Sequence, residues 1–237
     1  MGSRWHVCIL IPARNEEELL PRCLQSVNRA CAALPRSVTT DVIVAVDSST
    51  DRTGEIAVHM LTGRGTVITT EAAIVGRTRA LAAEAALHRY RGPLRRCWLA
   101  NTDADCSVPK TWLIDQLAIA SEDVDAIAGT VDVDSFRDHV IGTDERFRNK
   151  YLIHSDGSHP HVHGANLGVR ADVYLRAGGW GDLQTAEDHD LWNRLSEIGS
   201  RRRSIGHMTV LTSGRRVGRA PHGFAGALIA LSEVPTC

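Results

Sequence analysis

Short apolar runs separated by polar turns divide the first half of the chain into regular segments. The runs occupy residues 6–11, 41–46, 66–70 and 96–102. Continuous apolar runs of this length, unlike alternating ones, are typical of parallel strands that are buried on both faces. Polar residues follow each run, so we expect them to gather at the carboxyl edge of a single sheet, where open α/β folds bind their ligands.

Amphipathic segments follow these strands. From residue 16 to residue 34, apolar side chains recur at the three- and four-residue spacing of a helix, with acidic residues expected in its first turn. Further helices are predicted at 52–61, 76–90 and 110–121. Strands that alternate with helices at this spacing predict right-handed crossovers and an α/β fold, in which helices flank a Rossmann-like, mostly parallel sheet.

The pattern changes after Glu122. A strand is predicted at 125–134, and a polar stretch follows from 135 to 161, within which residues 155–159 have the composition of a flexible loop. The remaining predicted elements, in chain order, are a short helix at 171–177, an amphipathic helix at 187–198, a strand at 207–212 and a basic loop at 215–219.

Length and composition are those of an ordinary globular domain. The 237 residues, 43% hydrophobic and 23% charged, suffice for one large α/β domain but not for two. A formal net charge of −1 gives no reason to expect general affinity for nucleic acid. No apolar run approaches the ~20 residues that span a bilayer, and we expect no signal peptide before the first strand. The six cysteines lack Cys-x-x-Cys spacing, which indicates reduced thiols. We therefore expect a cytoplasmic protein, or one at the membrane surface.

Asp103 and Asp105 come directly after the fourth predicted strand. Two carboxylates at a strand tip can hold a hard divalent cation such as Mg²⁺ or Mn²⁺, while a diphosphate supplies further oxygen ligands. Aspartate is also common in turns, and the alternative is that the pair only caps and solvates a loop. An Asp-x-Asp pattern alone does not decide between these interpretations.

The order of several short motifs resembles that of the family 2 glycosyltransferases, which have the nucleotide-sugar-binding GT-A fold. The matching segments, spread over residues 6–215, are Ile11-Pro12-Ala13-Arg14-Asn15-Glu16-Glu17, Val46-Asp47-Ser48-Ser49-Thr50-Asp51-Arg52-Thr53, Gly76-Arg77-Thr78-Arg79, Thr102-Asp103-Ala104-Asp105, Gly164-Ala165-Asn166, Gly178-Gly179-Trp180 and Ala186-Glu187-Asp188. The resemblance implies one GT-A domain over 1–237, with a nucleotide-binding half at 6–121, an acceptor and catalytic half at 122–222, and a C-terminal tail at 223–237.

The resemblance implies a donor site built from strand tips and loops. The implied donor-binding residues are Pro12, Ala13, Arg14, Glu16, Asp47, Arg79, Asp103, Ala104, Gly164, Ala165 and Asn166. The family often has two acids and a glycine where this chain has Asp47 followed by Ser48, so the base contact would depend on Asp47. Arg79, near a helix N-terminus, would hold a phosphate. The alternatives are that Asn15 and Asp47 only cap helices, that Arg79 lies on a solvated helix face, and that Gly164 marks a strand bulge.

The same resemblance implies the catalytic and metal-binding residues. Asp188 would be the general base that deprotonates the acceptor hydroxyl, with Glu187 orienting the acceptor or a loop. Asp105 and Asp103 would hold Mg²⁺ or Mn²⁺, with His222 as a further ligand. Because Glu187 and Asp188 begin a predicted helix, an N-cap role is the alternative for them.

Two further segments have open interpretations. His159, His161 and His163 alternate, so on a strand they would share one face, and a second metal site is an alternative to a mobile polar loop. The apolar tail at 224–231 is expected to pack on the core, with a homodimer contact or a membrane contact as alternatives.

Together these features predict a metal-dependent, inverting glycosyltransferase. It would move a sugar from a nucleotide-diphosphate sugar, with a UDP-sugar favoured, to an unknown hydroxyl acceptor. One alternative is a nucleotidyltransferase, which places carboxylates and a metal at the same sheet edge but has a glycine-rich basic loop that this chain lacks near its first strand. The other is a non-catalytic protein that only binds a nucleotide-sugar.

Overall fold

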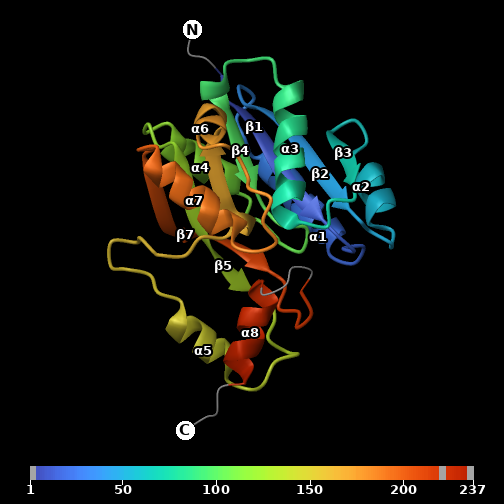
Figure 1. Cartoon of the computed structure of the whole chain (residues 1–237), viewed down its shortest axis with the longest axis vertical. Coiled ribbons are helices and arrows are strands. Elements are labelled where there is room, and N and C mark those ends of the chain that lie inside the picture. Colours follow the sequence, from blue (N-terminus) through green and yellow to red (C-terminus); the bar gives the residue numbers. More distant parts are fainter. Residues whose placement is uncertain (1–3, 219–222, 234–237) are drawn as a thin grey trace.

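A seven-stranded sheet lies at the centre of the computed structural model, which describes residues 4–218 and 223–233 (Figure 1). The strands, in the spatial order β3-β2-β1-β4-β6-β5-β7, are β3 (Gly65–Thr70), β2 (Thr39–Asp47), β1 (His6–Ala13), β4 (Cys97–Asn101), β6 (Leu167–Arg170), β5 (Ala126–Val133) and β7 (Arg202–Thr212). Strand β6 is antiparallel to both of its neighbours, and all other pairs are parallel. The predicted α/β class with a mostly parallel sheet is therefore confirmed.

Helices cover both faces of this sheet, as predicted. The covering helices are α1 (Leu20–Ala32), α2 (Thr53–Leu61), α3 (Val75–Arg89), α4 (Trp112–Ala120), α6 (Ala171–Arg176) and α7 (Glu187–Glu197). Two further helices are α5 (Thr143–Lys150) and α8 (Phe224–Ser232). Side chains of β1 alternate between the two layers: Val7, Ile9 and Ile11 belong to the core with α1, α2 and α4, whereas Cys8 and Leu10 belong to the core with α3, α6 and α7. Full burial of each large aliphatic side chain contributes about 1.5–3 kcal/mol. The central strands are thus held from both sides.

Helix α1 begins later than its apolar spacing suggests. It begins at Leu20, with a proline in its first turn, and no acidic residue lies in that turn, so the predicted acidic first turn is wrong. The segment before it is held by the loop that precedes α2: the backbone N–H of Glu16 donates to Thr53 Oγ1 at 2.7 Å, and that of Glu17 donates to Asp51 Oδ2 at 3.1 Å. These contacts satisfy amide donors that a helix beginning at residue 16 would leave without an intrahelical partner.

Helix α5, strand β6 and helix α8 were not predicted from the second half of the sequence. Helix α5 lies within the polar stretch 135–161, and β6 is a four-residue strand. Helix α5 buries one large apolar side chain, Phe147, whose partners include Phe224 in α8. Strand β7 is also longer than predicted, because it begins at Arg202. Each feature depends on partners distant in sequence, so local periodicity does not show it.

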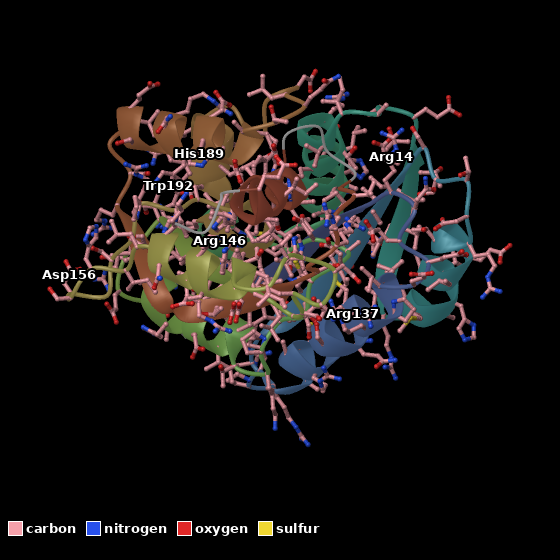
Figure 2. The ribbon with its side chains drawn as sticks, turned by 90° about the horizontal axis from the view of Figure 1, so that it is seen from below. Arg14, Arg137, Arg146, Asp156, His189 and Trp192 are labelled. Carbon is pink, nitrogen blue, oxygen red and sulfur yellow. The ribbon has the colours of Figure 1, made fainter. Side chains whose placement is uncertain are left out.

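Helices α5 and α8 lie beside each other below the carboxyl edge of the sheet (Figure 1). Leu228 of α8 packs with Val133 and Phe147, and the expectation that the tail packs on the rest of the chain is confirmed for this helix. Arg146 Nε donates to the backbone carbonyl of Leu231 at 2.7 Å, and Figure 2 shows Arg146 where the two helices meet. These contacts hold α8 against α5 and the end of β5.

Two observations apply only to the described part of the chain. None of its helices combines the length and apolar character needed to cross a membrane. Its five cysteines are all free thiols. Burial raises the pKa of the Cys23 and Cys106 thiols, so both are protonated and weakly reactive at neutral pH.

Candidate active site

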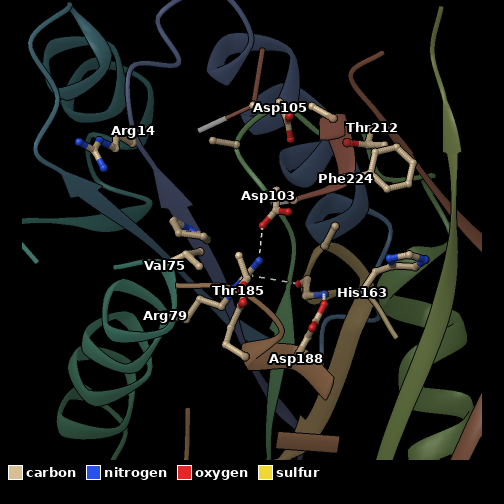
Figure 3. Close-up of a pocket in the computed structure, with 18 of the residues that line it drawn as sticks. Arg14, Val75, Arg79, Asp103, Asp105, His163, Thr185, Asp188, Thr212 and Phe224 are labelled. Atoms are coloured by element: carbon tan, nitrogen blue, oxygen red, sulfur yellow. Dashed lines mark hydrogen bonds and ion pairs between the residues drawn. The ribbon is translucent and has the colours of Figure 1, made fainter. Parts of the chain in front are cut away.

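A cavity of about 640 Å³ opens at the carboxyl edge of the sheet (Figure 3). Its walls come from the tips of β1, β2 and β4, the starts of α3 and α7, the loop after β7, and the start of α8. The predicted site residues that line it are Pro12, Ala13, Arg14, Glu16, Asp47, Arg79, Asp103, Ala104, Asp105, Gly164, Ala165, Glu187 and Asp188. Parallel strands end at the same edge, which explains why segments so distant in sequence meet in one cavity.

The Asp103-Ala104-Asp105 segment turns sharply just beyond β4, where the Cys106 N–H donates to the Asp103 carbonyl at 3.0 Å. Asp103, Asp105 and Cys106 each offer a ligand atom, and these atoms lie within 4.8 Å of one another. Burial raises the pKa of Asp105, and nearby Arg215 partly offsets that effect. Two carboxylates in such proximity fit the oxygen preference of Mg²⁺ or Mn²⁺. His222 lies outside the described residues.

Arg79 lies deep in the cavity wall and joins the two acidic motifs. Its side chain is 3% exposed; Nη2 donates to Asp103 Oδ1 at 2.6 Å, and Nε donates to Glu187 Oε1 at 3.1 Å (Figure 3). A cation–π contact places the guanidinium 5.3 Å from the ring centre of Trp180. Burial alone lowers the pKa of Arg79, but the two carboxylates outweigh it and raise the pKa. The alternative of a solvated helix face is therefore wrong.

Asp188 lies in the first turn of α7, and its carboxylate faces the cavity (Figure 3). Oδ2 accepts from the Gly164 N–H at 2.9 Å, and Oδ1 accepts from the His189 N–H at 2.8 Å. The N-cap position belongs to Ala186, so the N-cap alternative for Glu187 and Asp188 is wrong. Ala186 has a left-handed φ of 59°, a conformation that costs a non-glycine residue about 1 kcal/mol or more. This strained entry fixes the direction in which the acidic pair leaves the loop.

Glu187 differs from Asp188 in its surroundings. Its side chain is buried and paired with Arg79, and burial raises its pKa despite that cation. A group enclosed in this way suits a role in holding Arg79 and the start of α7 in place.

Asp47 and Arg14 also line the cavity, and Arg14 lies across the view from Asp188 in Figure 3. Asp47 is 4% exposed; Oδ1 accepts from the Ala73 N–H at 3.0 Å, and Oδ2 accepts from Thr78 Oγ1 at 2.9 Å. Asp47 therefore anchors the start of α3 while also lining the cavity. Asn15 joins two loops, since its Oδ1 accepts from the Thr50 N–H at 2.8 Å.

Asn166 was expected to line the cleft, and this expectation is wrong. Its side chain is completely buried; Nδ2 donates to the backbone carbonyls of Thr130 and Met208 at 2.8 and 2.7 Å, and Oδ1 accepts from Trp112 Nε1 at 2.9 Å. The amide thus ties β5, β7 and α4 together behind the cavity wall. Gly164 must lack a side chain, because a Cβ there would lie 2.5 Å from Nη2 of Arg79.

The three alternating histidines do share one face, where their rings stack. Ring centres of His159 and His161 lie 5.8 Å apart, and those of His161 and His163 lie 6.1 Å apart. Tyr151 Oη lies 2.9 Å from His163 Nε2. Burial, reinforced by the other imidazoles, lowers the pKa of His163 to about 3, so this cavity residue is neutral at physiological pH. Within the described chain, the three-ligand group that could hold a metal contains no histidine.

Arg215, His163 and Phe224 line the cavity but were not among the donor-binding, metal-binding or catalytic residues expected from the sequence. Arg215 belongs to the basic loop predicted after the last strand, but composition gives no reason to select one arginine there. Nη1 of Arg215 lies 2.7 Å from Glu16 Oε1, and Nη2 lies 3.0 Å from Asp105 Oδ2. These pairs connect the last strand to the tips of β1 and β4.

Solved glycosyltransferases share this fold. The structure of S. aureus TarS 1-349 in complex with UDP-GlcNAc is 15% identical, with a TM-score of 0.68, over 97% of this chain and 68% of that one. The mannosyltransferase PcManGT from Pyrobaculum calidifontis, in complex with GDP-Man and Mn²⁺, is 19% identical, with a TM-score of 0.65, over 98% and 70%. GalNAc-T7 with UDP, GalNAc and Mn²⁺ is 14% identical, with a TM-score of 0.68, over 95% and 46%. These likenesses show a common GT-A fold, and each neighbour is longer than the part it shares.

Sequence comparison identifies the family to which the chain belongs. No curated protein sequence matches the chain. The sequence model of the family described as glycosyl transferase family 2, however, matches residues 8–175, which is more than half of the chain. This stretch contains the tips of β1, β2 and β4 and the Asp103–Asp105 pair. The chain belongs to glycosyl transferase family 2.

Proposed function

We propose that this glycosyltransferase is metal-dependent and inverting, and that it transfers a sugar from a nucleotide-diphosphate sugar to an acceptor hydroxyl. One observation carries the proposal: a single cavity contains both the Asp103–Asp105 pair and the Asp188 carboxylate. A cation at the leaving diphosphate and a base at the incoming hydroxyl both assist a direct displacement. The TarS and GalNAc-T7 structures contain UDP or a UDP-sugar, which supports UDP as the favoured nucleotide, while the GDP-Man bound to PcManGT keeps GDP as an alternative.

The donor would extend from the Asp47 end of the cavity toward Asp188. Asp47 and the β1 tip, with Pro12, Ala13 and Arg14, would surround the base and ribose. Asp105 and Asp103 would hold Mg²⁺ or Mn²⁺, and this ion, when bound, would offset the charge that develops on the departing diphosphate. Gly164 and Ala165 bring little side-chain bulk to the wall near Asp188, which leaves space for the sugar ring.

Asp188 would accept the proton of the acceptor hydroxyl while the hydroxyl oxygen forms a bond to the anomeric carbon. The bond from that carbon to the diphosphate oxygen breaks on the opposite side, so the configuration inverts. The N–H groups of Gly164 and His189 each hold one carboxylate oxygen and thereby fix the orientation of the base. Glu187, paired with Arg79, would keep the base and the cation site at a fixed position relative to each other.

The test combines ligand binding with turnover. Thermal shifts would be measured with UDP-, GDP-, dTDP- and ADP-sugars, with and without Mn²⁺, on the wild type, Asp105→Ala and Asp188→Asn. A ligand that binds only the native state raises its apparent stability. We expect one nucleotide class to stabilise the wild type in the presence of Mn²⁺, Asp105→Ala to lose this response, and Asp188→Asn to retain it without turnover.

Product analysis separates the alternatives. NMR of the transferred sugar should show the anomeric configuration opposite to that of the donor. Pyrophosphate release from a nucleoside triphosphate would instead identify a nucleotidyltransferase, and donor binding without any transfer or hydrolysis would identify a binding protein. Either of these results would overturn the proposal.

A further inference from the structure

Arg215 pairs with the carboxylate of Asp105, which a bound cation would also need. Its guanidinium lies between Asp105 Oδ2, at 3.0 Å, and Glu16 Oε1, at 2.7 Å. The side chains of Asp105 and Glu16 are 14% and 5% exposed, so water screens both pairs weakly.

A guanidinium and a divalent cation compete for Asp105. Both are drawn to the same carboxylate, and two positive groups on one carboxylate repel each other. A bare cation must therefore displace Arg215 from Asp105 before it binds. A cation that arrives with a diphosphate changes this balance, because phosphate oxygens accept the planar, paired N–H donors of arginine well.

The loop geometry allows the side chain of Arg215 to move while its backbone stays in place. Just before it, the Gly214 N–H donates to Asp134 Oδ1 at 3.0 Å, and a Cβ on Gly214 would lie only 1.8 Å from the Ser135 carbonyl oxygen. This close packing anchors the loop at Gly214. The guanidinium of Arg215 is 24% exposed and lines the cavity.

Arg79 cannot make the same exchange as easily. It is 3% exposed and held by Asp103, Glu187 and the Gly164 carbonyl. Arg14 lies toward the opposite end of the cavity from Asp188 (Figure 3). Of these three cavity arginines, Arg215 is the one that contacts the Asp105 side chain and retains exposure toward the cavity.

We propose that Arg215 is a diphosphate-binding residue that serves as the counter-ion of Asp105 while the donor site is empty. The metal and the diphosphate then bind together, because the diphosphate gives Arg215 a new partner when the metal takes Asp105. Arg215 thus weakens binding of the metal alone and strengthens binding of the metal with a diphosphate. This inference rests on the proposed function for the identity of the ligand.

The test measures free Mn²⁺ by electron paramagnetic resonance, with and without inorganic pyrophosphate, on the wild type, Arg215→Gln and Arg216→Gln. Arg216 is the matched control, because it is the next residue and its side chain reaches the Asp138 carbonyl at 3.2 Å. Arg215→Gln should bind Mn²⁺ alone about tenfold more tightly, which corresponds to about 1.4 kcal/mol. With Mn²⁺ present, it should bind pyrophosphate about tenfold more weakly. Arg216→Gln should match the wild type in both titrations.

The two opposite changes distinguish ion exchange from simple damage to the fold, which would weaken both. Arg215→Lys, which keeps the charge but lacks the planar donors, should lie between the wild type and Arg215→Gln. Unchanged Mn²⁺ affinity in Arg215→Gln, or equal effects in Arg216→Gln, would overturn the inference even if sugar transfer is found. Opposite changes in a protein that transfers no sugar would leave the inference standing and overturn only the proposed function.

Discussion

Replacing Arg79 by methionine should destabilise the protein strongly, even though methionine can fill much of the apolar part of the space. The guanidinium is the shared counter-ion of Asp103 and Glu187, and it also donates to the Gly164 carbonyl at 3.3 Å. Methionine leaves both carboxylates beside an apolar side chain. The variant therefore tests whether this buried cation organises the active site.

The expected loss follows from the burial of each partner. Removal of one member of a buried ion pair costs about 3–5 kcal/mol. Asp103 is 34% exposed, so water compensates part of its loss, whereas Glu187 is 8% exposed and dominates the effect. We therefore expect a loss of about 3 kcal/mol in the free energy of unfolding, a large part of the 5–15 kcal/mol typical of a domain.

Urea denaturation followed by tryptophan fluorescence would measure this loss for Arg79→Met and Arg79→Lys. Arg77→Met is the matched control, because Arg77 lies on the same helix and is exposed, and it should change stability by less than about 0.5 kcal/mol. The loss should also depend on pH. Burial already raises the pKa of Glu187 above its ordinary value of 4.5, and removal of Arg79 raises it further.

A carboxyl group whose pKa is higher in the folded than in the unfolded state stabilises the folded state while it is protonated. Its contribution to stability is therefore lost as pH rises from its ordinary value through its raised one. Arg79→Met should consequently be less destabilised at pH 5 than at pH 8. A loss below about 1 kcal/mol at pH 8, or an equal loss at both pH values, would refute the reasoning that Arg79 neutralises a buried carboxylate.

Three further predictions concern the base, the amide behind the cavity and the histidine stack. Asp188→Asn should lower sugar transfer by about 100-fold or more while metal-dependent donor binding persists, as measured by initial rates and calorimetry, and near-normal rates would exclude the base role. Asn166→Leu should lower the free energy of unfolding by about 2–4 kcal/mol in urea, because two backbone carbonyls and an indole N–H lose their buried partner, and a neutral effect would contradict this. Because the pKa of His163 is about 3 when folded, the wild type should lose up to about 1.4 kcal/mol of stability per pH unit as pH falls below 6.5, where only the unfolded histidine takes up a proton. His163→Asn should lack this contribution, and equal acid sensitivity of the two proteins would exclude it.

Local sequence patterns predicted the parts of this fold that depend on local constraints. An apolar run such as that of β1 has no polar face, so it must be covered on both sides, which already implies a sheet between two layers of helices. Parallel strands all present their carboxyl ends at one edge, so polar residues after the strands predicted where Asp47, Asp103 and Asp105 would meet. The amphipathic spacing over residues 187–198 likewise predicted that Asp188 lies at the start of a helix.

Tertiary structure decided what depends on residues distant in sequence. Helix α5 contains little apolar surface of its own and is held by α8. Asn166 lies in a motif that resembles a cleft-lining segment. Its amide points inward instead, because it forms hydrogen bonds there with backbone carbonyls of β5 and β7 and with the Trp112 indole. The amino-acid sequence alone thus determined the alternation of strands and helices and the edge at which the site forms. Only the folded chain determined that Arg79 and Arg215 hold the site's carboxylates, because a charge selects its partner by distance in space.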